Sequence, residues 1–219
     1  MKGLQRHTWN WTDNMIKNII FDIGDVLVYF RPDKAMEEIG IDKSRIPELM
    51  NSTVYSKWWC ELDRGVMDEQ DVVRAMINDA PDYKADIEKF LRESGEHIVE
   101  KFCYTDELIK SVKDKGFKVY LLSNYPRSFF EIHSQKQLDF VKSVDGKIVS
   151  AYVKLIKPDR RIYEVLLDTY NLNPDECLFI DDRKENVDAA NESGIHGIVF
   201  TGYEELIKEI NNSGGINRC

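Results

Sequence analysis

Three short apolar runs, each ending in polar side chains, constrain the fold of this chain more than any other feature. Residues 18–22 read Asn-Ile-Ile-Phe-Asp, residues 117–124 end in Ser-Asn, and residues 177–182 end in two aspartates. Continuous apolar runs of this length are typical of strands buried on both faces of a parallel sheet. Weaker strand patterns over 147–149 and 197–200 raise the expected number of strands to five.

Helical patterns separate the later strands. From residue 105 onward the chain alternates between strand and helix, which predicts a parallel sheet with helices on both faces. Gly116 and Gly194 stand where two of the helices are expected to end, as glycine commonly does. The expected fold is therefore α/β, a doubly wound, Rossmann-like sheet of five parallel strands. The helices of this half are expected over 105–115, 127–137, 159–170, 185–193 and 203–210.

The segment between the first and second strands has a different pattern. From Arg31 to about Lys101 the apolar residues follow helical spacing, and no strand-like run appears. Asp68, followed by Asp71 three residues later, predicts a capped helix start. This segment is therefore expected to be entirely helical, with helices over 33–39, 45–51, 68–78 and 82–93.

The expected domain organisation is a core interrupted by an insert. Residues 15–32 and 102–219 form the Rossmann-like core, and residues 33–101 form an α-helical cap inserted after the first strand. Residues 1–14 add no apolar periodicity. They are either an N-terminal extension or a segment that precedes a true start at Met15.

Composition narrows the class of protein. The 219 residues are 42% hydrophobic and 32% charged, which is ordinary for a soluble globular domain with its own core. A net charge of −9 argues against nucleic acid as a partner, because such proteins usually carry a basic face. No apolar run approaches the ~18–20 residues of a membrane span. The four cysteines lack CxxC spacing and are typical of a reducing compartment. We expect a cytoplasmic protein, a monomer or weak homodimer, without membrane contact.

The polar strand ends predict one site. In doubly wound sheets, ligands bind at the carboxyl ends of the strands, which is where Asp22, Asp181 and Asp182 are expected. Carboxylates brought together repel one another unless a cation lies between them, and oxygen ligands favour Mg²⁺. Each group also has an ordinary structural interpretation: a helix cap for Asp181 or Asp182, a turn for Ser123 and Asn124, and a surface amine for Lys157.

Phosphoryl chemistry fits this set of residues. Lys157, the Ser123 hydroxyl and the backbone N–H of Asn124 could hold an anionic group such as a phosphate. A phosphate held between a metal and Lys157 would face Asp22, which could attack phosphorus and form an aspartyl-phosphate. The metal and the lysine would offset charge on the transferring oxygens.

Four segments resemble the motifs of the haloacid dehalogenase (HAD)-like hydrolases in order and spacing. They are Phe21-Asp22-Ile23-Gly24-Asp25-Val26-Leu27, Leu122-Ser123-Asn124, Lys157-Pro158 and Phe179-Ile180-Asp181-Asp182, and the resemblance covers about residues 17–210. The helical insert resembles the small α-helical cap of that superfamily. Asp63-Arg64-Gly65 with Asp68 resembles a cap segment of its α-D-glucose-1-phosphate phosphatase-like members.

The resemblance implies a role for each matching position. Asp22 would be the nucleophile and a metal ligand, and Gly24 would offer its carbonyl to the metal. Ser123 and Asn124 would bind phosphate, and Lys157 would hold both phosphate and nucleophile. Asp182 is the stronger candidate for direct metal ligation, with Asp181 as a ligand or a partner through water.

One position departs from the pattern of the family's phosphatases. Most of them carry a second Asp two residues after the nucleophile, as general acid and base, and here that residue is Gly24. Asp25 is expected to point elsewhere. Three explanations stay open: a good leaving group such as the anomeric oxygen of a sugar 1-phosphate, an acid supplied by the cap, or weak activity. The glucose-1-phosphate phosphatase-like members share the Asp-x-Gly pattern.

The leading hypothesis is a Mg²⁺-dependent phosphatase acting on a small phosphorylated metabolite, such as a hexose-1-phosphate. The alternatives are a metal-independent 2-haloacid dehalogenase using the same Asp22, and a catalytically weak or non-enzymatic protein on this fold. Trp58 is a candidate for stacking on substrate, although one of Trp58 and Trp59 is expected in the core. Arg64 is a candidate for phosphate or sugar contact, with an ion pair to Glu61 or Asp68 as its alternative.

Overall fold

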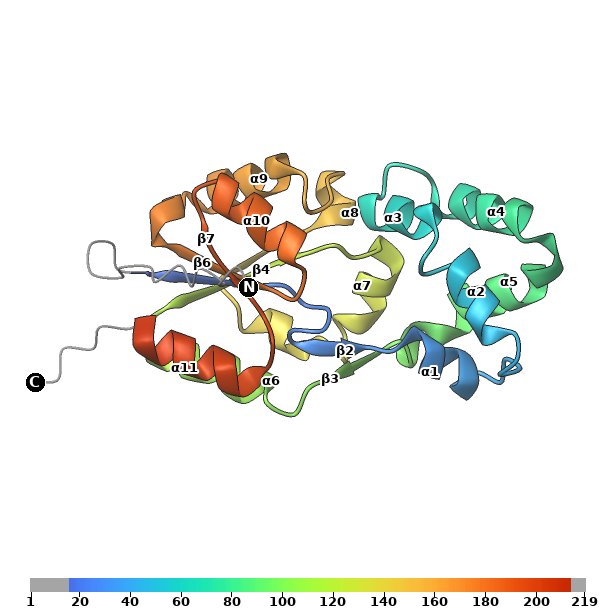
Figure 1. Ribbon diagram of the computed structural model, residues 1–219, viewed down its shortest axis with the longest axis horizontal. Coiled ribbons are helices and arrows are strands. Elements are labelled where there is room, and N and C mark those ends of the chain that lie inside the picture. Colours follow the sequence, from blue (N-terminus) through green and yellow to red (C-terminus); the bar gives the residue numbers. More distant parts are fainter. Residues whose placement is uncertain (1–15, 214–219) are drawn as a thin grey trace, which may run out of the picture.

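A five-stranded parallel sheet forms the centre of the larger lobe of this computed structural model, which describes residues 16–213. The expectations for residues 1–14 and Met15 lie outside that range. The strand order is β5-β4-β1-β6-β7, so the first strand lies in the middle of the sheet (Figure 1). The five expected strands are confirmed. Their bounds are β1 (Asn18–Phe21), β4 (Lys118–Ser123), β5 (Gly146–Val149), β6 (Cys177–Asp181) and β7 (His196–Val199).

Alternate residues of β1 are buried on opposite faces of the sheet. Ile19 and Phe21 join one apolar cluster and Ile20 joins the other, as the two-residue period of a strand requires. The first cluster includes side chains of α6 (Thr105–Asp114) and α11 (Tyr203–Ser213). The second includes α9 (Arg160–Tyr170) and α10 (Lys184–Glu192). Helices therefore cover both faces, and ligands of doubly wound sheets bind at the carboxyl ends of the strands.

The segment between β1 and β4 forms a second, helical lobe (Figure 1). Asp68 caps the longest of its helices, since its side chain accepts a hydrogen bond from Gln70 N at 2.9 Å. This confirms the capped start expected at Asp68. The lobe comprises α1 (Pro32–Glu38), α2 (Ile46–Ser52), α3 (Lys57–Arg64), α4 (Glu69–Asp79) and α5 (Lys84–Glu93), with short 3-10 turns at Pro81–Tyr83 and Ser94–Glu96.

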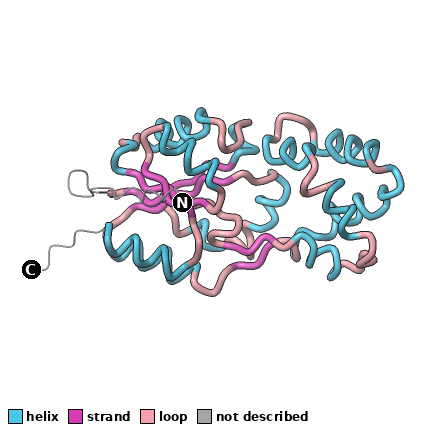
Figure 2. The backbone as a smooth tube through the Cα atoms, in the orientation of Figure 1, coloured by secondary structure: helices cyan, strands magenta, loops and turns pink. Residues whose placement is uncertain are grey.

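A two-stranded antiparallel ribbon joins the lobes, and the expectation of no strand between Arg31 and Lys101 was wrong at β3. β2 (Val28–Phe30) pairs with β3 (Val99–Lys101), so that the chain leaves the core and returns to it side by side (Figure 2). The sequence of β3 is Val-Glu-Lys, too short and too charged to show a strand pattern. Its partner lies about 70 positions earlier in the chain, so pairing rather than local pattern forms this strand.

Two short helices on the core face the cap. α7 (Arg127–His133) follows β4, and α8 (Ser150–Val153) follows β5 directly. Gly65, at the end of α3, has a φ of +61° and lies so close to α8 that a Cβ there would be 2.8 Å from the Ala151 carbonyl oxygen. The remaining turns are 3-10 segments at Asp139–Lys142 and Pro174–Glu176. None of the helices within residues 16–213 is long and apolar enough to cross a membrane.

Candidate active site

Asp22, Lys157 and Asp181 form a buried charged group at the carboxyl edge of the sheet. β1 and β6 pair in parallel with Phe21 opposite Ile180, so the aspartates that follow these two residues emerge side by side. The Lys157 Nζ lies 2.9 Å from Asp22 Oδ1 and 2.6 Å from Asp181 Oδ2. All three side chains are nearly inaccessible to solvent. Lys157 is therefore a buried cation between two buried carboxylates and not an ordinary surface lysine.

The pKa values of this group follow from burial and charge together. Burial raises the pKa of Asp22, and the nearby Lys157 ammonium opposes that rise. Burial lowers the pKa of Lys157, but the two carboxylates outweigh it and raise that pKa overall. The lysine is therefore a cation at neutral pH. Ser123, buried at the end of β4, adds a hydrogen bond that stabilises the Asp22 carboxylate.

Asp181 is already fully engaged by protein groups. Its Oδ1 accepts hydrogen bonds from Arg183 N at 2.9 Å and from Asn186 Nδ2 at 2.9 Å, while Oδ2 binds Lys157. Asn186 is buried on the first turn of α10. Sequence reasoning missed this residue; the signal was its position five residues after Asp181, where α10 turns its side chain back toward the strand end.

Asn124 holds the backbone of Lys157 rather than pointing into the site. Its Oδ1 accepts from Lys157 N at 2.8 Å and its Nδ2 donates to Lys157 O at 3.0 Å. The amide side chain thus fixes the segment that carries the lysine. Asn124, which follows the last residue of β4, lines the cavity together with Ser123.

A cavity of about 300 Å³ opens above these residues, between the core and the cap. Asp22, Ser123, Lys157 and Asp182 line one end of it. Oxygen atoms of Asp22, Asp181 and Asp182 lie within 4.8 Å of one another, and Asp182 is the most exposed of the three. Burial, with the charges of Asp22 and Asp181, raises the pKa of Asp182 to about 6. Such crowding of hard oxygen donors fits Mg²⁺, which would relieve the repulsion.

Gly24 leaves free space in the loop after β1. It lines the cavity, and a Cβ built on it meets nothing within 4 Å among the described residues. The neighbouring Asp25 has a φ of +52°, and its Oδ1 accepts a hydrogen bond from Phe30 N at 3.0 Å. Asp25 is thus committed to the turn that leads into β2, as expected from its position.

The cap contributes a carboxyl group, Asp63, to the same cavity. Its Oδ1 is buried and has no hydrogen-bond partner in the part of the chain that the structure describes. Burial, followed by the negative charge of Asp22, raises the pKa of Asp63 to about 8. Ser150 fixes this end of α3: its hydroxyl donates to Asp63 O at 2.5 Å and accepts from Tyr125 N at 2.9 Å. The sequence identified the motif that contains Asp63, but it did not predict that this side chain would share a cavity with Asp22.

Two predicted contact residues lie outside the cavity lining. Trp58 points away, and its indole Nε1 donates to Asp79 Oδ2 at 2.7 Å. Arg64 pairs with Glu61, with Nε 3.4 Å from Oε1, which was the alternative expected for it. The neighbouring Trp59 lines the cavity instead and packs in the core against Phe129. Adjacent helix positions face different directions, and the burial of Trp59 decides which ring reaches the site.

The far end of the cavity contains a buried histidine–tyrosine pair. The Tyr125 hydroxyl lies 2.5 Å from His133 Nδ1, and His133 Nε2 lies 2.5 Å from the Gly95 carbonyl oxygen. Burial lowers the pKa of His133 to about 4. The neutral ring therefore donates from Nε2 and accepts from the tyrosine, which joins α7 to the segment returning from the cap.

A doubly wound sheet with aspartates and a lysine at its carboxyl edge, under an inserted helical cap, defines a class of hydrolases. The chain belongs to the haloacid dehalogenase-like hydrolase family, whose model matches residues 16–194. It is therefore an enzyme of the hydrolase class, as the motifs predicted.

Similar proteins include characterised enzymes and solved structures. Flavin mononucleotide hydrolase 1 of Arabidopsis thaliana is 26% identical over 90% of this chain and 77% of its own. Sesquiterpene phosphatase astK of Aspergillus oryzae is 26% identical over 84% of this chain and 90% of its own. A HAD family enzyme of Bacteroides thetaiotaomicron was solved with magnesium and inorganic phosphate. Its structure has a TM-score of 0.68 at 20% identity and covers 87% of this chain and 98% of its own. This structural likeness supports the fold.

Proposed function

We propose that this protein is a Mg²⁺-dependent phosphatase that hydrolyses a small phosphorylated metabolite through an aspartyl-phosphate on Asp22. The observation that carries the proposal is the Lys157 ammonium, 2.9 Å from Asp22 and 2.6 Å from Asp181 at one end of the cavity. A carboxylate beside a fixed cation is arranged to attack an anionic phosphorus centre. FMN and sesquiterpene phosphatase activities named for two relatives support this reaction type.

Mg²⁺ would be held by Asp22, Asp182 and the Gly24 carbonyl. Asp181 would contact the ion through water, because Lys157, Arg183 and Asn186 already bind both of its oxygens. The ion would supply positive charge beside the transferring phosphoryl oxygens. The proposed ligands are hard oxygen donors, the kind that Mg²⁺ prefers.

The protein's own groups would bind the phosphate and carry out the two displacement steps. Lys157 Nζ, the Ser123 hydroxyl and the backbone N–H of Asn124 bind the phosphate oxygens. A carboxylate oxygen of Asp22 forms a bond to phosphorus as the bond from phosphorus to the alcohol oxygen breaks. Water then attacks phosphorus, the bond to Asp22 breaks, and inorganic phosphate leaves with the carboxylate regenerated.

We further propose that Asp63 supplies the proton that Gly24 cannot. Its unpartnered carboxyl faces the cavity from the cap, and a pKa of about 8 keeps it protonated at neutral pH. It would give its proton to the departing alcohol oxygen and take one back from the attacking water. A cap-borne acid was one of the explanations that the sequence left open for the Asp-x-Gly pattern.

Substrate and compartment are proposed more coarsely. A hexose-1-phosphate remains a candidate from the cap motif and the leaving-group argument, whereas FMN and sesquiterpene phosphates enter through the relatives' names. A cytoplasmic location is proposed from cysteine usage, with Cys60 and Cys103 exposed as free thiols. Monomer or weak homodimer remains the proposed oligomeric state.

Phosphate release from a panel of esters tests the proposal. The panel contains p-nitrophenyl phosphate, acetyl phosphate, a hexose-1-phosphate and FMN, each with Mg²⁺ and again with chelator. We expect release that chelator abolishes and that Asp22→Asn lowers by at least about 10⁴-fold, because the nucleophile is lost. Asp33→Asn, an exposed carboxylate on α1, is the matched control and should keep wild-type rates.

Two outcomes would contradict the proposal. Halide release from 2-haloacids that needs Asp22 but no metal, without phosphate release, would identify a dehalogenase. Phosphate release that persists in Asp22→Asn would exclude the aspartyl-phosphate route.

A further inference from the structure

The cavity has two chemically different ends. The charged end is formed by Asp22, Lys157 and Asp182, from the core strands. The other end is mostly apolar: beside the Tyr125–His133 pair, it is lined by rings and methyl groups from β2, β3, α3, α7 and the loops before α3 and β3. Its members are Phe30, Val54, Trp59, Ile98, Val99 and Phe129. A phosphate bound at the first end would therefore direct the rest of its ester into an apolar chamber.

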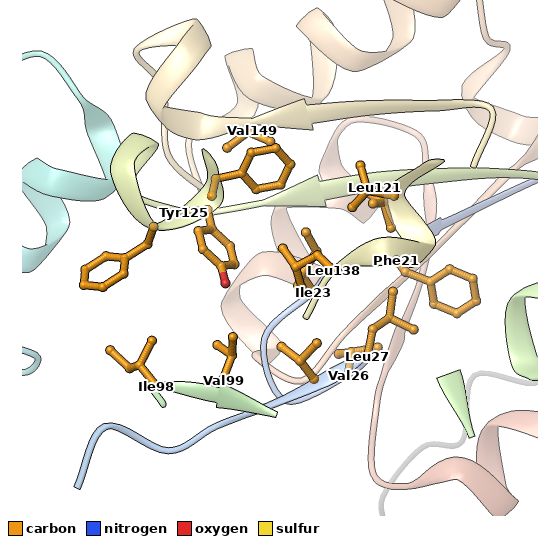
Figure 3. Close-up of a cluster of buried hydrophobic side chains, with 14 of the residues drawn as sticks. Phe21, Ile23, Val26, Leu27, Ile98, Val99, Leu121, Tyr125, Leu138 and Val149 are labelled. Atoms are coloured by element: carbon orange, nitrogen blue, oxygen red, sulfur yellow. The ribbon is translucent and has the colours of Figure 1, made fainter. Parts of the chain in front are cut away.

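The walls of the chamber come from packed elements rather than mobile side chains. Ile98 and Val99 point from the returning strand toward Tyr125 at the end of β4 (Figure 3). Trp59 stacks with Phe129 at 5.9 Å and with Phe90 at 6.2 Å between centroids. Buried rings held by other rings form a preorganised wall, which a flat or compact apolar group can fill at little conformational cost.

Several polar side chains that reach the cavity are already engaged by the protein. Tyr125 and His133 bond to each other, Asp25 binds the Phe30 N–H, and the Asn186 side-chain nitrogen donates to Asp181. Two lining oxygens, Asp63 Oδ1 and Asn186 Oδ1, have no partner among the described residues, and neither belongs to the apolar wall. A sugar ring placed against the carbon wall would bury hydroxyl groups without partners. Each such hydroxyl lowers binding substantially, whereas an apolar ring gains from leaving water.

We propose that the chamber selects phosphate monoesters of compact apolar alcohols, aromatic or alicyclic, over phosphorylated sugars. This inference rests on the proposed phosphatase function for its phosphate end and deepens it at the leaving-group end. The volume of about 300 Å³ limits the alcohol to a small ring system.

A matched pair of esters tests the selectivity. Cyclohexylmethyl phosphate and glucose 6-phosphate share a six-membered ring and a primary phosphate ester and differ mainly in hydroxyl groups. We expect kcat/KM to favour the apolar ester by about 100-fold or more, since an apolar pocket wall rejects a single added hydroxyl by about that factor. Equal rates, or a preference for the sugar, would overturn the inference.

Isosteric changes in the wall give a second readout. Val54→Thr and Val99→Thr each add one hydroxyl to the chamber without changing its volume and should reduce the preference several-fold. Val165→Thr is the control: Val165 packs on α9 against the cluster on the other face of the sheet and should leave the preference unchanged. A ratio that moves equally in all three variants would contradict a role for the chamber wall.

Binding separates this inference from the proposed function. In Asp22→Asn, where no turnover is expected, cyclohexylmethyl phosphate should raise the melting temperature more than glucose 6-phosphate at equal concentration. That ranking can be obtained even if no ester is hydrolysed, in which case the phosphatase proposal fails while the selectivity stands. A reversed ranking, while the wild-type protein still releases phosphate from p-nitrophenyl phosphate, would contradict the proposed selectivity and support the phosphatase function.

Discussion

At the scale of single residues, the proton source separates this chain from phosphatases with a second aspartate in the first loop. Gly24 leaves open space where that side chain would be, and Asp63 brings a carboxyl from the opposite lobe. Ser150 connects the two lobes at this point through hydrogen bonds to Asp63 O and Tyr125 N. The position of the proposed acid therefore depends on how the cap docks.

Replacing Asp63 by Asn tests this role. A poor leaving group needs a proton and a good one does not, so kcat/KM for an alkyl phosphate should fall by about 10²–10⁴-fold while that for p-nitrophenyl phosphate changes little. The protonated form is the active one, so wild-type kcat/KM for the alkyl ester should fall as pH rises through the pKa of Asp63. Steady-state kinetics with both esters over pH 6–10 measure this. An equal loss with both esters would reduce Asp63 to a structural residue.

Sequence reasoning grouped the residues that stand at strand ends. Asp22, Ser123 and Asp182 lie where strands of the parallel sheet share an edge, and the structure places them with Lys157 at one end of the cavity. The sequence could not decide which of two adjacent residues on a short helix faces the cavity. Trp58 and Trp59 are equivalent in the sequence, and only packing against Phe30, Phe90 and Phe129 shows that Trp59 faces inward.

At the scale of elements, the joint between α3 and α8 sets the geometry of the site. Gly65 ends α3 in the left-handed region, and its missing side chain lets α8 approach. Lys154, just after α8, donates a hydrogen bond to the Gly65 carbonyl. Asp63 lies two residues before Gly65, so a displacement of this contact would also displace the proposed acid.

Gly65→Ala should therefore damage both stability and activity. Gly116, with a φ of +90° and nothing within 4 Å of its Cβ position, is the matched control. Gly116→Ala should cost about 1 kcal/mol for its left-handed backbone, whereas Gly65→Ala should cost more because of the backbone clash with Ala151. Urea unfolding measures the difference, and the alkyl phosphate assay should show a loss for Gly65→Ala alone. Equal effects of the two substitutions on both measurements would contradict the role of the joint.

The elements that sequence patterns missed are those created by contacts between distant segments. The five sheet strands follow from apolar runs and four helices of the insert (α1, α2, α4 and α5) from apolar periodicity, which each segment carries by itself. The helix α3, over Lys57–Arg64, was not among the expected helices. β3 and the four-residue α8 carry too few residues for any period. β3 exists because β2 offers an antiparallel partner, and that ribbon also brings Ile98 and Val99 to the cavity.

At the scale of the whole molecule, negative charge is gathered at the cavity. The chain carries a net charge of −9, and oxygens of three aspartates lie within 4.8 Å of one another there. Lys157 is a buried cation that bridges two of them. Folding brings these charges together, so a ligand that neutralises them should stabilise the entire fold.

Mg²⁺ should therefore raise the melting temperature, independently of any turnover. At 100 times its Kd, the ion would add about 2.7 kcal/mol to the free energy of unfolding. Asp182→Asn removes one repelling carboxylate, so the variant should melt higher than wild type without metal and gain less from Mg²⁺. Asp175→Asn, which removes an exposed carboxylate outside the cavity, should respond to Mg²⁺ as wild type does. Calorimetry with and without the ion measures all three proteins. Of these two aspartates, Asp182 alone belongs to the crowded carboxylates. If Mg²⁺ raises the melting temperatures of Asp182→Asn and Asp175→Asn equally, Asp182 is not a ligand.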